Sequence, residues 1–523
     1  MIDPKGVVRG TGLRGTGLGR YAEAPPRWAL PLVVFAGLAA RLWQYLGNAS
    51  FWIDELALVD DVLHIPLRAL LVRPLPLDQI APPAFLAALK ASSVWLGAGE
   101  PELRLFPFAC ALASVVLFAA LARRVLPPWT AVFAAAIFAL LPLLISWSAS
   151  VKQYSTDVAV SIAVILAALR LLAPGCRARD RIAAAAIGAA APWLSHTAAF
   201  TVAGCGAALA AIAVVAPVGG DRRRRTVAAL ATVVLVWAAS AGAAVALSRS
   251  LLTESTRDYM ARFWEPSLPG PEILALLVLG GFLLARRGPR TASVLLAPVV
   301  LTLAAAAAHV YPFSGRSVLF LVPVFLLAAA EAGALLVTGI AALRVPRPAA
   351  AALVVVPLLV AFAGNLPVYE REEMRPLLGR LAERVREGDV LYVYYGAARA
   401  FRFYAPRAGI PLSRAALGGC HRGNPRGYLR EVDAFRGSPR LWVVVAHPAA
   451  RLREVPGLLG YLGSIGAGRE RIAETGAFAE LYDLSDPVRL ASATAEDFPV
   501  VTPAPDSSGY DCAHGPIARA PWE

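Results

Sequence analysis

Hydrophobic blocks of about twenty residues recur along this chain, and short arginine clusters separate many of them. A helix of about twenty residues rises 1.5 Å per residue, enough to cross a bilayer core of about 30 Å. Of the 523 residues, 58% are hydrophobic, and the mean hydropathy is +0.59. A soluble fold would leave too much of that apolar surface in water. The pattern predicts a polytopic α-helical membrane protein.

The arginine clusters give each predicted span a direction, because lysine and arginine are enriched in cytoplasmic loops. About eleven spans place nearly every cluster on one side of the membrane. They are expected at residues 28–46, 104–122, 126–147, 155–172, 182–195, 198–217, 226–247, 271–285, 291–308, 317–341 and 349–366. This arrangement predicts a multi-pass protein of the plasma (inner) membrane, with a cytoplasmic N-terminus.

The same arrangement divides the chain into three parts. We expect a basic cytoplasmic tail at 1–27, a transmembrane domain at 28–367 with an outer loop at 48–103, and an extracytoplasmic domain at 368–523. In the last part, "REEMRPLLGRLAERVREG" predicts an amphipathic helix, and "DVLYVYY" and "LWVVVAH" predict buried strands. Together these elements predict a small α/β domain. Segment 82–97 is short and opens with two prolines, so we expect an interfacial helix there.

Several other functions are disfavoured by the sequence. The net charge of +14 does not indicate nucleic acid binding, because the basic residues lie between apolar blocks. A G-x-G-x-x-G match beginning at Gly10 has no preceding strand, so no nucleotide cofactor is expected. No cofactor and no required metal are predicted. Cys420 and Cys512 share the predicted outer side, and whether they form a disulfide stays open, because sequence gives no distance.

An acidic pair follows the first predicted span in "FWIDELALVDDVL". Asp54 and Glu55 would stand at the membrane surface, where acidic residues are costly and tend to be functional. Partial desolvation would raise the pKa of a carboxylate there and suit it to take a proton from a hydroxyl. Helix capping by Asp54, with Glu55 in the first turn, explains the pair equally well.

Two cations are expected at the same membrane face. Arg104 stands at the outer start of the second span, and Lys152 stands at the outer end of the third, in "SVKQYSTD". Together they suit a lipid-linked phosphate, and the Tyr154 hydroxyl could join them. Snorkelling at the interface is the alternative for both. The chain has only three lysines, at positions 5, 90 and 152, and lysine is a compact charge with three rotatable donors.

The motifs "WIDE", "APPAFLAALK…GAGEPELRLFP" and "SVKQYST" occur in that order and resemble a known family. They are similar to polyprenyl-phosphate-sugar-dependent glycosyltransferases of the GT-C fold. That group includes protein O-mannosyltransferases, lipid A aminoarabinose transferases and bacterial transferases of the RgtA/B/C/D-like kind. The similarity covers roughly residues 28–200, with looser matches at "SHTAAF" and "YPFSGRSVLFLVP".

The resemblance implies a GT-C type fold and roles for particular residues. Asp54 matches the family's catalytic base, and Glu55 matches its acidic neighbour. Arg104 matches the arginine that opens the next span. Lys152 and Tyr154 match a basic-x-Tyr element, where many members have arginine. The C-terminal part matches nothing in the family that would identify the acceptor.

Further residues are weaker candidates for donor or acceptor contacts. Arg316 opens the tenth span and is a candidate phosphate ligand or a snorkelling residue. Asp78, Gln79, His196 and Trp264 are candidate substrate contacts, each also explained by loop structure, packing or an aromatic belt. Tyr259 is a similar candidate and is also explained by an aromatic belt. Asp60 and Asp61 could bind a divalent ion together with Asp54, but they are expected on the solvated face of a helix.

The sequence therefore predicts an inverting glycosyltransferase at the outer membrane face. Its partners would be a polyprenyl-phosphate-linked sugar donor, a glycan, lipid or protein acceptor, and membrane lipids, without nucleic acid. Asp54 would be the general base, and basic residues would hold the leaving phosphate. A transporter or flippase of lipid-linked sugar is the alternative, although repeated segments and midplane charges, which transporters often show, are not evident. The sugar, the lipid length and the acceptor are not given by the sequence.

Overall fold

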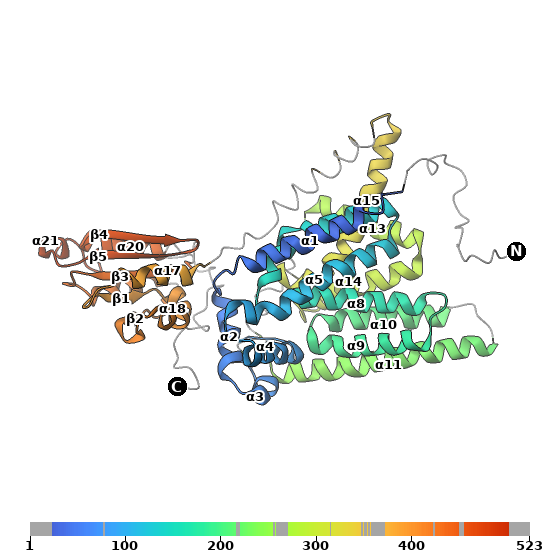
Figure 1. The fold of residues 1–523 in the computed structure, drawn as a ribbon, viewed down its shortest axis with the longest axis horizontal. Coiled ribbons are helices and arrows are strands. Elements are labelled where there is room, and N and C mark those ends of the chain that lie inside the picture. Colours follow the sequence, from blue (N-terminus) through green and yellow to red (C-terminus); the bar gives the residue numbers. More distant parts are fainter. Residues whose placement is uncertain are drawn as a thin grey trace.

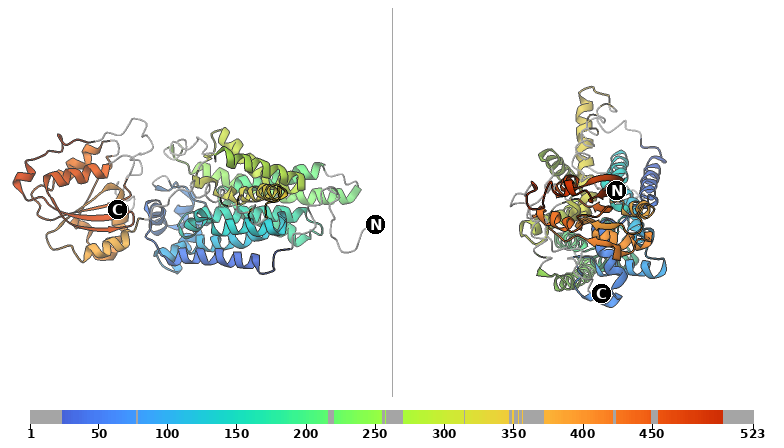
Figure 2. Two further views of the ribbon diagram at one scale, coloured as in Figure 1. Left: turned by 90° about the horizontal axis from the view of Figure 1, so that it is seen from above. Right: turned by 90° about the vertical axis from the view of Figure 1, so that its left-hand side faces the viewer.

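The computed structural model consists of a long helix bundle with a smaller sheet-containing domain at one end of its long axis (Figure 1). The view from above shows the same two parts end to end (Figure 2). The structure describes residues 24–76, 79–215, 220–254, 257, 270–313, 315–346, 349, 353, 356, 372–421, 424–448 and 454–500. The protein is a polytopic membrane protein with an additional C-terminal sheet domain, as predicted.

Long apolar helices build the bundle. They are α1 (Ala29–Leu46), α5 (Glu100–Val125), α6 (Pro128–Leu140), α7 (Pro142–Ser146) with η3 (Trp147–Ala149), α8 (Tyr154–Leu172), α9 (Ala178–Leu194), α10 (Ala198–Val215), α11 (Gly220–Ser250), α13 (Pro271–Arg287), α14 (Pro289–Ala307), and η4 (Gly315–Leu321) with α15 (Val322–Ala342). Three shorter helices, α2 (Ile53–His64), α3 (Leu67–Val72) and α4 (Pro83–Trp95), lie between α1 and α5 in the chain and cover one end of the bundle (Figure 1).

The number of spans is lower than expected on a strict test. Seven helices among the described residues are long and apolar enough to cross a membrane, or eight if α6 and α7–η3 count as one span bent by 48°. Helices α9 and α13 occupy two further predicted spans but have 17 residues each. The predicted span at 349–366 lies almost entirely outside the described residues. The expected helix at 82–97 is present as α4.

Successive spans bring Lys152, His196 and Arg316 to the bundle end that carries α2–α4, which we call the α2 end. Arg316 bonds to Asp54 in α2, and Lys152 bonds to Gln79 in the loop before α4. His196 borders a cavity that Gln79 also lines. Helices α5 and α13 begin at the α2 end, and their arginines lie in their last turns, at the other end of the bundle. The direction in which successive spans run therefore agrees with the placement of the arginine clusters in the sequence.

The C-terminal domain is a five-stranded mixed sheet with helices on both faces. Its strands are β1 (Val390–Val393), β2 (Ala415–Leu417), β3 (Leu441–Ala446), β4 (Ala467–Glu474) and β5 (Ala477–Asp483), in the order β2-β1-β3-β5-β4. Strand β1 is parallel to β2 and β3, and β5 is antiparallel to β3 and β4. Both strands expected from the sequence, β1 and β3, are central and buried. The helices are α17 (Met374–Ala382), α18 (Ala398–Tyr404), α19 (Pro425–Asp433), α20 (Glu454–Ile465) and α21 (Pro487–Leu490).

One hydrophobic core joins the two parts of the molecule. It includes Phe51 and Leu58 around α2, Phe85 of α4, Leu378 of α17 and Trp442 of β3. A second core on the other sheet face belongs to the C-terminal domain alone. The first core therefore holds α2, and with it the acidic pair, between the bundle and the C-terminal domain.

The cysteines that the structure describes differ in their bonding. Cys420 is disulfide-bonded, whereas Cys110, Cys176 and Cys205 are free. Cys512 lies outside the described residues.

Helices α13 and α15 cross at Gly280. This crossing fixes the position of α15, which directly follows η4, the helix that carries Arg316. A Cβ atom at Gly280 would collide with the backbone carbonyl of Ala328. The neighbouring Gly281 has only side-chain atoms of Leu296 nearby, at 3.6 Å or more from an added Cβ. A backbone contact cannot yield as a flexible side chain can, so the crossing depends on the absence of a side chain at Gly280.

We expect Gly280→Ala to lower the melting temperature of the purified protein, because α15 must move away from α13. Gly281→Ala is the matched control, since both substitutions gain the same helix propensity of about 1 kcal/mol. Thermal unfolding in detergent measures both. Equal melting temperatures for the two variants would contradict the close crossing at Gly280.

Candidate functional site

The site begins at the N-terminus of α2. Trp52 is the N-cap, with extended backbone at φ −91° and ψ 171°. The Trp52 amide donates to the carboxylate of Glu55 at 3.3 Å, which satisfies one amide that helix geometry leaves without a partner. Asp54 and Glu55 occupy the first turn, where negative charge is favourable. Helix phase then points these adjacent carboxylates in different directions.

Glu55 points inward and is completely buried. Arg104 binds it through two parallel bonds, Nε to Oε1 at 3.1 Å and Nη2 to Oε2 at 2.7 Å. The Val151 amide also donates to Glu55 Oε1, at 2.6 Å. Arg104 further bonds to the carbonyls of Ala49 and Ser50. The buried Glu55–Arg104 pair therefore links α2, α5 and the segment before Lys152.

Asp54 points to a more open position. Its Oδ2 accepts a hydrogen bond from Arg316 Nη1 at 2.8 Å, and the two side chains are 30% and 38% exposed. The Arg316 guanidinium also stands 5.7 Å from the ring centres of Trp52 and Tyr154. Of the two ion pairs at the start of α2, this is the one that a substrate can reach.

Lys152 lies beside this pair and is largely buried. Its Nζ donates to Gln79 Oε1 at 2.7 Å. Burial lowers the pKa of Lys152 to about 8, against the opposing charge of Asp54. Lys152 is therefore mostly charged at neutral pH and becomes neutral in mildly alkaline solution.

The net pKa shift of Asp54 is opposite to the rise expected from the sequence. Burial raises the pKa of this carboxyl, but the charges of Arg316 and Lys152 outweigh burial and hold it below its usual value. The expectation considered desolvation alone and left out the cations that the fold brings to Asp54. In this arrangement Asp54 is ionised and paired.

The C-terminal domain holds the segment that carries Asp54. Glu372 Oε2 accepts from the Ile53 amide at 3.2 Å, and Glu372 Oε1 contacts His447 Nδ1 at 2.5 Å. The Tyr404 hydroxyl accepts from the Phe51 amide at 2.7 Å. Sequence analysis did not find these contacts. The two contacts to the amides of Ile53 and Phe51 join residues more than 300 positions apart, and no local pattern signals them.

Of the weaker substrate-contact candidates, the structure describes Gln79 and His196. His196 lines a cavity with Gln79, Leu70 and Leu252, and Lys152 is not among the residues that line it. Asp78 and Trp264, together with Tyr259, lie outside the described residues. Gln79 is thus the substrate-contact candidate that touches the site directly, through Lys152.

The two aspartates expected on a wet face differ in their surroundings. Asp60 is partly exposed, whereas Asp61 is completely buried, and neither carboxylate oxygen of Asp61 has a hydrogen-bond partner. Burial and the charge of Asp60 raise the pKa of Asp61 to about 8. The wet-face expectation is therefore wrong for Asp61. Over the described ranges, no three or more His, Cys, Asp or Glu side chains form a group that could hold a metal ion.

Fold and site together define a polytopic membrane protein with a site built jointly by its helix bundle and its C-terminal domain. No family model and no curated protein matches the chain. Among solved structures, it is similar to the Archaeoglobus fulgidus oligosaccharyltransferase in complex with zinc and sulfate, at 12% identity and TM-score 0.46, covering 86% of this chain and 72% of that one. It is also similar to ArnT from Cupriavidus metallidurans bound to undecaprenyl phosphate, at 16% identity and TM-score 0.45, covering 86% and 97%.

We expect Glu55→Gln to destabilise the protein strongly, because it leaves the Arg104 charge buried without its partner. Breaking a buried pair in this way costs about 3–5 kcal/mol. Asp54→Asn is the matched control, since the Asp54–Arg316 pair is partly exposed, and a pair at the surface contributes only about 0–1 kcal/mol. Thermal unfolding in detergent compares them. A larger loss of stability in Asp54→Asn than in Glu55→Gln would reverse the roles assigned to the two carboxylates.

Proposed function

We propose that this protein is an inverting glycosyltransferase, which moves a sugar from a polyprenyl-phosphate donor to an acceptor hydroxyl. The observation that carries the proposal is the accessible Asp54–Arg316 pair beside Lys152, at the junction of a membrane bundle and a C-terminal domain. A base and two cations at one end of a membrane domain suit a substrate with a lipid-linked phosphate. The motif resemblance at Asp54, Lys152 and Tyr154 supports the same reaction.

In the proposed reaction, donor binding activates the base. The donor phosphate takes up hydrogen bonds from Arg316 and Lys152, so part of the positive charge that stabilises the Asp54 carboxylate is neutralised. The pKa of Asp54 then rises, since desolvation by burial acts with less opposition. Asp54 becomes a better general base when the substrate is in place.

Transfer itself follows from this geometry. Asp54 takes the proton of the acceptor hydroxyl while the oxygen of that hydroxyl attacks the anomeric carbon of the donor sugar. The bond from that carbon to the phosphate oxygen breaks, and the phosphate leaves with the electron pair. Attack on the face opposite the phosphate inverts the anomeric configuration. Negative charge grows on the leaving phosphate, so fixed cations stabilise the transition state more than the bound substrate.

The sequence-based candidates take different parts in this proposal. Lys152 and Arg316 hold the phosphate, and the Arg316 guanidinium is supported by the Tyr154 ring, whose centre is 5.7 Å away. Glu55 and Arg104 act as scaffold, since their bonds to each other leave them sealed from solvent. Gln79 orients Lys152.

The remaining expectations complete the proposal. Asp78, His196 and Trp264 stay proposed substrate contacts. The α2 end would face outward from the plasma (inner) membrane, and the N-terminus would face the cytoplasm. The acceptor would be a glycan, lipid or protein hydroxyl. No nucleotide is needed, because the lipid phosphate is the leaving group.

Asp54→Asn keeps the shape of the side chain and removes its basicity. We expect transfer to fall about 10²-fold or more, the usual scale of general-base loss, while binding of polyprenyl phosphate to the purified variant persists. Mass spectrometry of cell-envelope glycans compares a deletion strain complemented with wild type or variant. Glu387→Gln, at an exposed position of the C-terminal domain, serves as an expression-matched control. Full glycan modification by a folded Asp54→Asn protein would remove Asp54 from the reaction.

The pH dependence of transfer tests Lys152. Its amine is protonated below its pKa of about 8, so transfer should decline as the pH rises through that value and the charge is lost. Lys152→Arg should move this alkaline decline upward, because arginine stays protonated to about pH 12, although the different donor geometry lowers the maximum rate. Lys152→Gln should abolish most transfer. The same alkaline midpoint in wild type and Lys152→Arg would exclude Lys152 as the titrating group.

A further inference from the structure

The span that leads to Lys152 is broken inside the bundle. Helix α6 ends at Leu140, and the chain turns by 48° into α7 and η3. Pro142 has no amide hydrogen, so the carbonyl of Phe138 loses its helical donor. Phe138 and Ala139 both belong to the last turn of α6, whose carbonyls have no partner within the helix. In a membrane domain such carbonyls need a donor from elsewhere in the protein.

Arg41 of α1 supplies that donor. Its Nη1 bonds to the carbonyl of Ala139 at 2.7 Å and to that of Gly37, in its own helix, at 3.1 Å. Its Nη2 bonds to the carbonyl of Phe138 at 3.4 Å, and the guanidinium stands 5.8 Å from the Phe138 ring centre. Gly37 lets α1 approach this closely, since a Cβ there would stand 2.7 Å from that of Ala139.

The segment after the break forms one wall of the proposed transfer site. Trp147 packs against Trp52, with ring centres 6.2 Å apart, and against Tyr154, at 4.6 Å. The Val151 amide bonds to Glu55, and Lys152 follows. The bend at α6 therefore sets the position of every group that this segment brings to the site.

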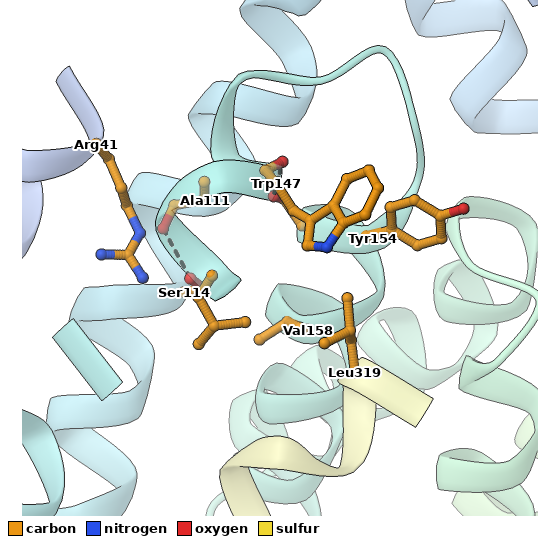
Figure 3. A pocket seen from close by; sticks show the side chains of 9 residues that line it. Arg41, Ala111, Ser114, Trp147, Tyr154, Val158 and Leu319 are labelled. Carbon is orange, nitrogen blue, oxygen red and sulfur yellow. Dashed lines mark hydrogen bonds between the residues drawn. The ribbon is translucent and has the colours of Figure 1, made fainter. Parts of the chain in front are cut away.

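Arg41 itself reaches toward this segment. Figure 3 shows its side chain and the rings of Trp147 and Tyr154 around one cavity, with Ser114 between them. Arg41 is completely buried, and its Nε has no hydrogen-bond partner. Across the described ranges no carboxylate pairs with it. A buried arginine in a membrane span is costly, and an unbroken apolar helix would not require it.

We propose that Arg41 is a positioning residue of the transfer site, which holds the broken span in the bend that presents Trp147, Tyr154 and Lys152. This inference rests on the proposed function for its effect on transfer. The effect of Arg41 on the surroundings of Lys152 does not depend on that function. The experiment therefore measures both the transfer rate and the titration of Lys152.

The principal variants are Arg41→Met, Arg41→Lys and a matched control, Arg124→Met. Arg124 also donates to a span carbonyl, that of Leu169 at 2.6 Å, but from the last turn of α5, away from the site. Both methionine variants should lower the melting temperature. Only Arg41→Met should also lower the maximum transfer rate, by about tenfold or more, since small misplacements of reacting groups have large effects. Arg41→Lys should recover part of the rate.

The second measurement does not need transfer. The chain has three lysines, at positions 5, 90 and 152, so acetylation of each is resolved by peptide mass spectrometry. Labelling of Lys152 with acetic anhydride as a function of pH reports the titration of its amine, and Lys90, whose Nζ bonds to the carbonyls of Val62 and Leu63, is the internal standard. Charged groups that act on Lys152 include Asp54, Arg316, Glu55 and Arg399, and also Asp61.

In wild type the labelling midpoint of Lys152 should lie near pH 8. In Arg41→Met it should move upward by about one unit, because a displaced segment leaves the amine less buried. Arg124→Met should leave the Lys152 midpoint unchanged, and the ratio of Lys152 to Lys90 labelling corrects for the amount of reagent. Arg41→Met with wild-type rate and wild-type Lys152 midpoint would overturn the inference and leave Arg41 a stabilising residue only.

Gly37→Ala provides a second route if Arg41→Met does not fold. It keeps Arg41 but pushes α1 away from Ala139, so it should shift the Lys152 midpoint in the same direction. Adding Ala139→Gly removes the nearest of the colliding atoms and should reduce the shift. An unshifted Gly37→Ala midpoint would also count against the inference. If wild type shows no transfer but the midpoints shift as expected, the proposed function fails and the positioning role of Arg41 stands.

Discussion

The arrangement of the site depends on one buried carboxylate. Glu55 accepts hydrogen bonds from Arg104, from the Trp52 amide that caps its own helix, and from the Val151 amide. These donors come from the start of α2, from α5 and from the segment before Lys152. Removing two charges from water is costly, and good geometry with further hydrogen bonds offsets that cost. With both oxygens occupied, Glu55 fixes three chain segments relative to one another and leaves Asp54 as the carboxylate that faces outward.

The C-terminal domain is part of this construction. It shares a hydrophobic core with α2 and α4, and Glu372 and Tyr404 bond to the backbone amides of Ile53 and Phe51. A helix N-terminus normally leaves such amides to water or to local caps. Here a distant domain satisfies them, so the direction of Asp54 depends on the docking of that domain. The domain thus has a structural reason to be present that does not depend on the proposed function.

Charge balance decides what the open part of the site can do. Asp54 lies between burial, which favours its neutral form, and the cations Arg316 and Lys152, which favour the carboxylate. Lys152 has the reverse balance, since burial opposes its charge and Asp54 supports it. Such mutually dependent charges respond together to an incoming anion. A phosphate would take up the cations and leave Asp54 as a stronger base, which couples donor binding to catalysis in the proposed function.

The sequence by itself determined the membrane class, most of the spans, the central strands β1 and β3, and the loop that carries Asp54. These follow from local periodicity and from arginine placement, which act within a few turns of chain. Tertiary structure decided which acidic residue is sealed and which is open, and that Arg316 pairs with Asp54. It also decided that Arg41 serves a broken span 97 to 98 positions away. Such pairings depend on how helices and domains pack, and a residue's type and neighbours in the chain do not encode its partner across the fold.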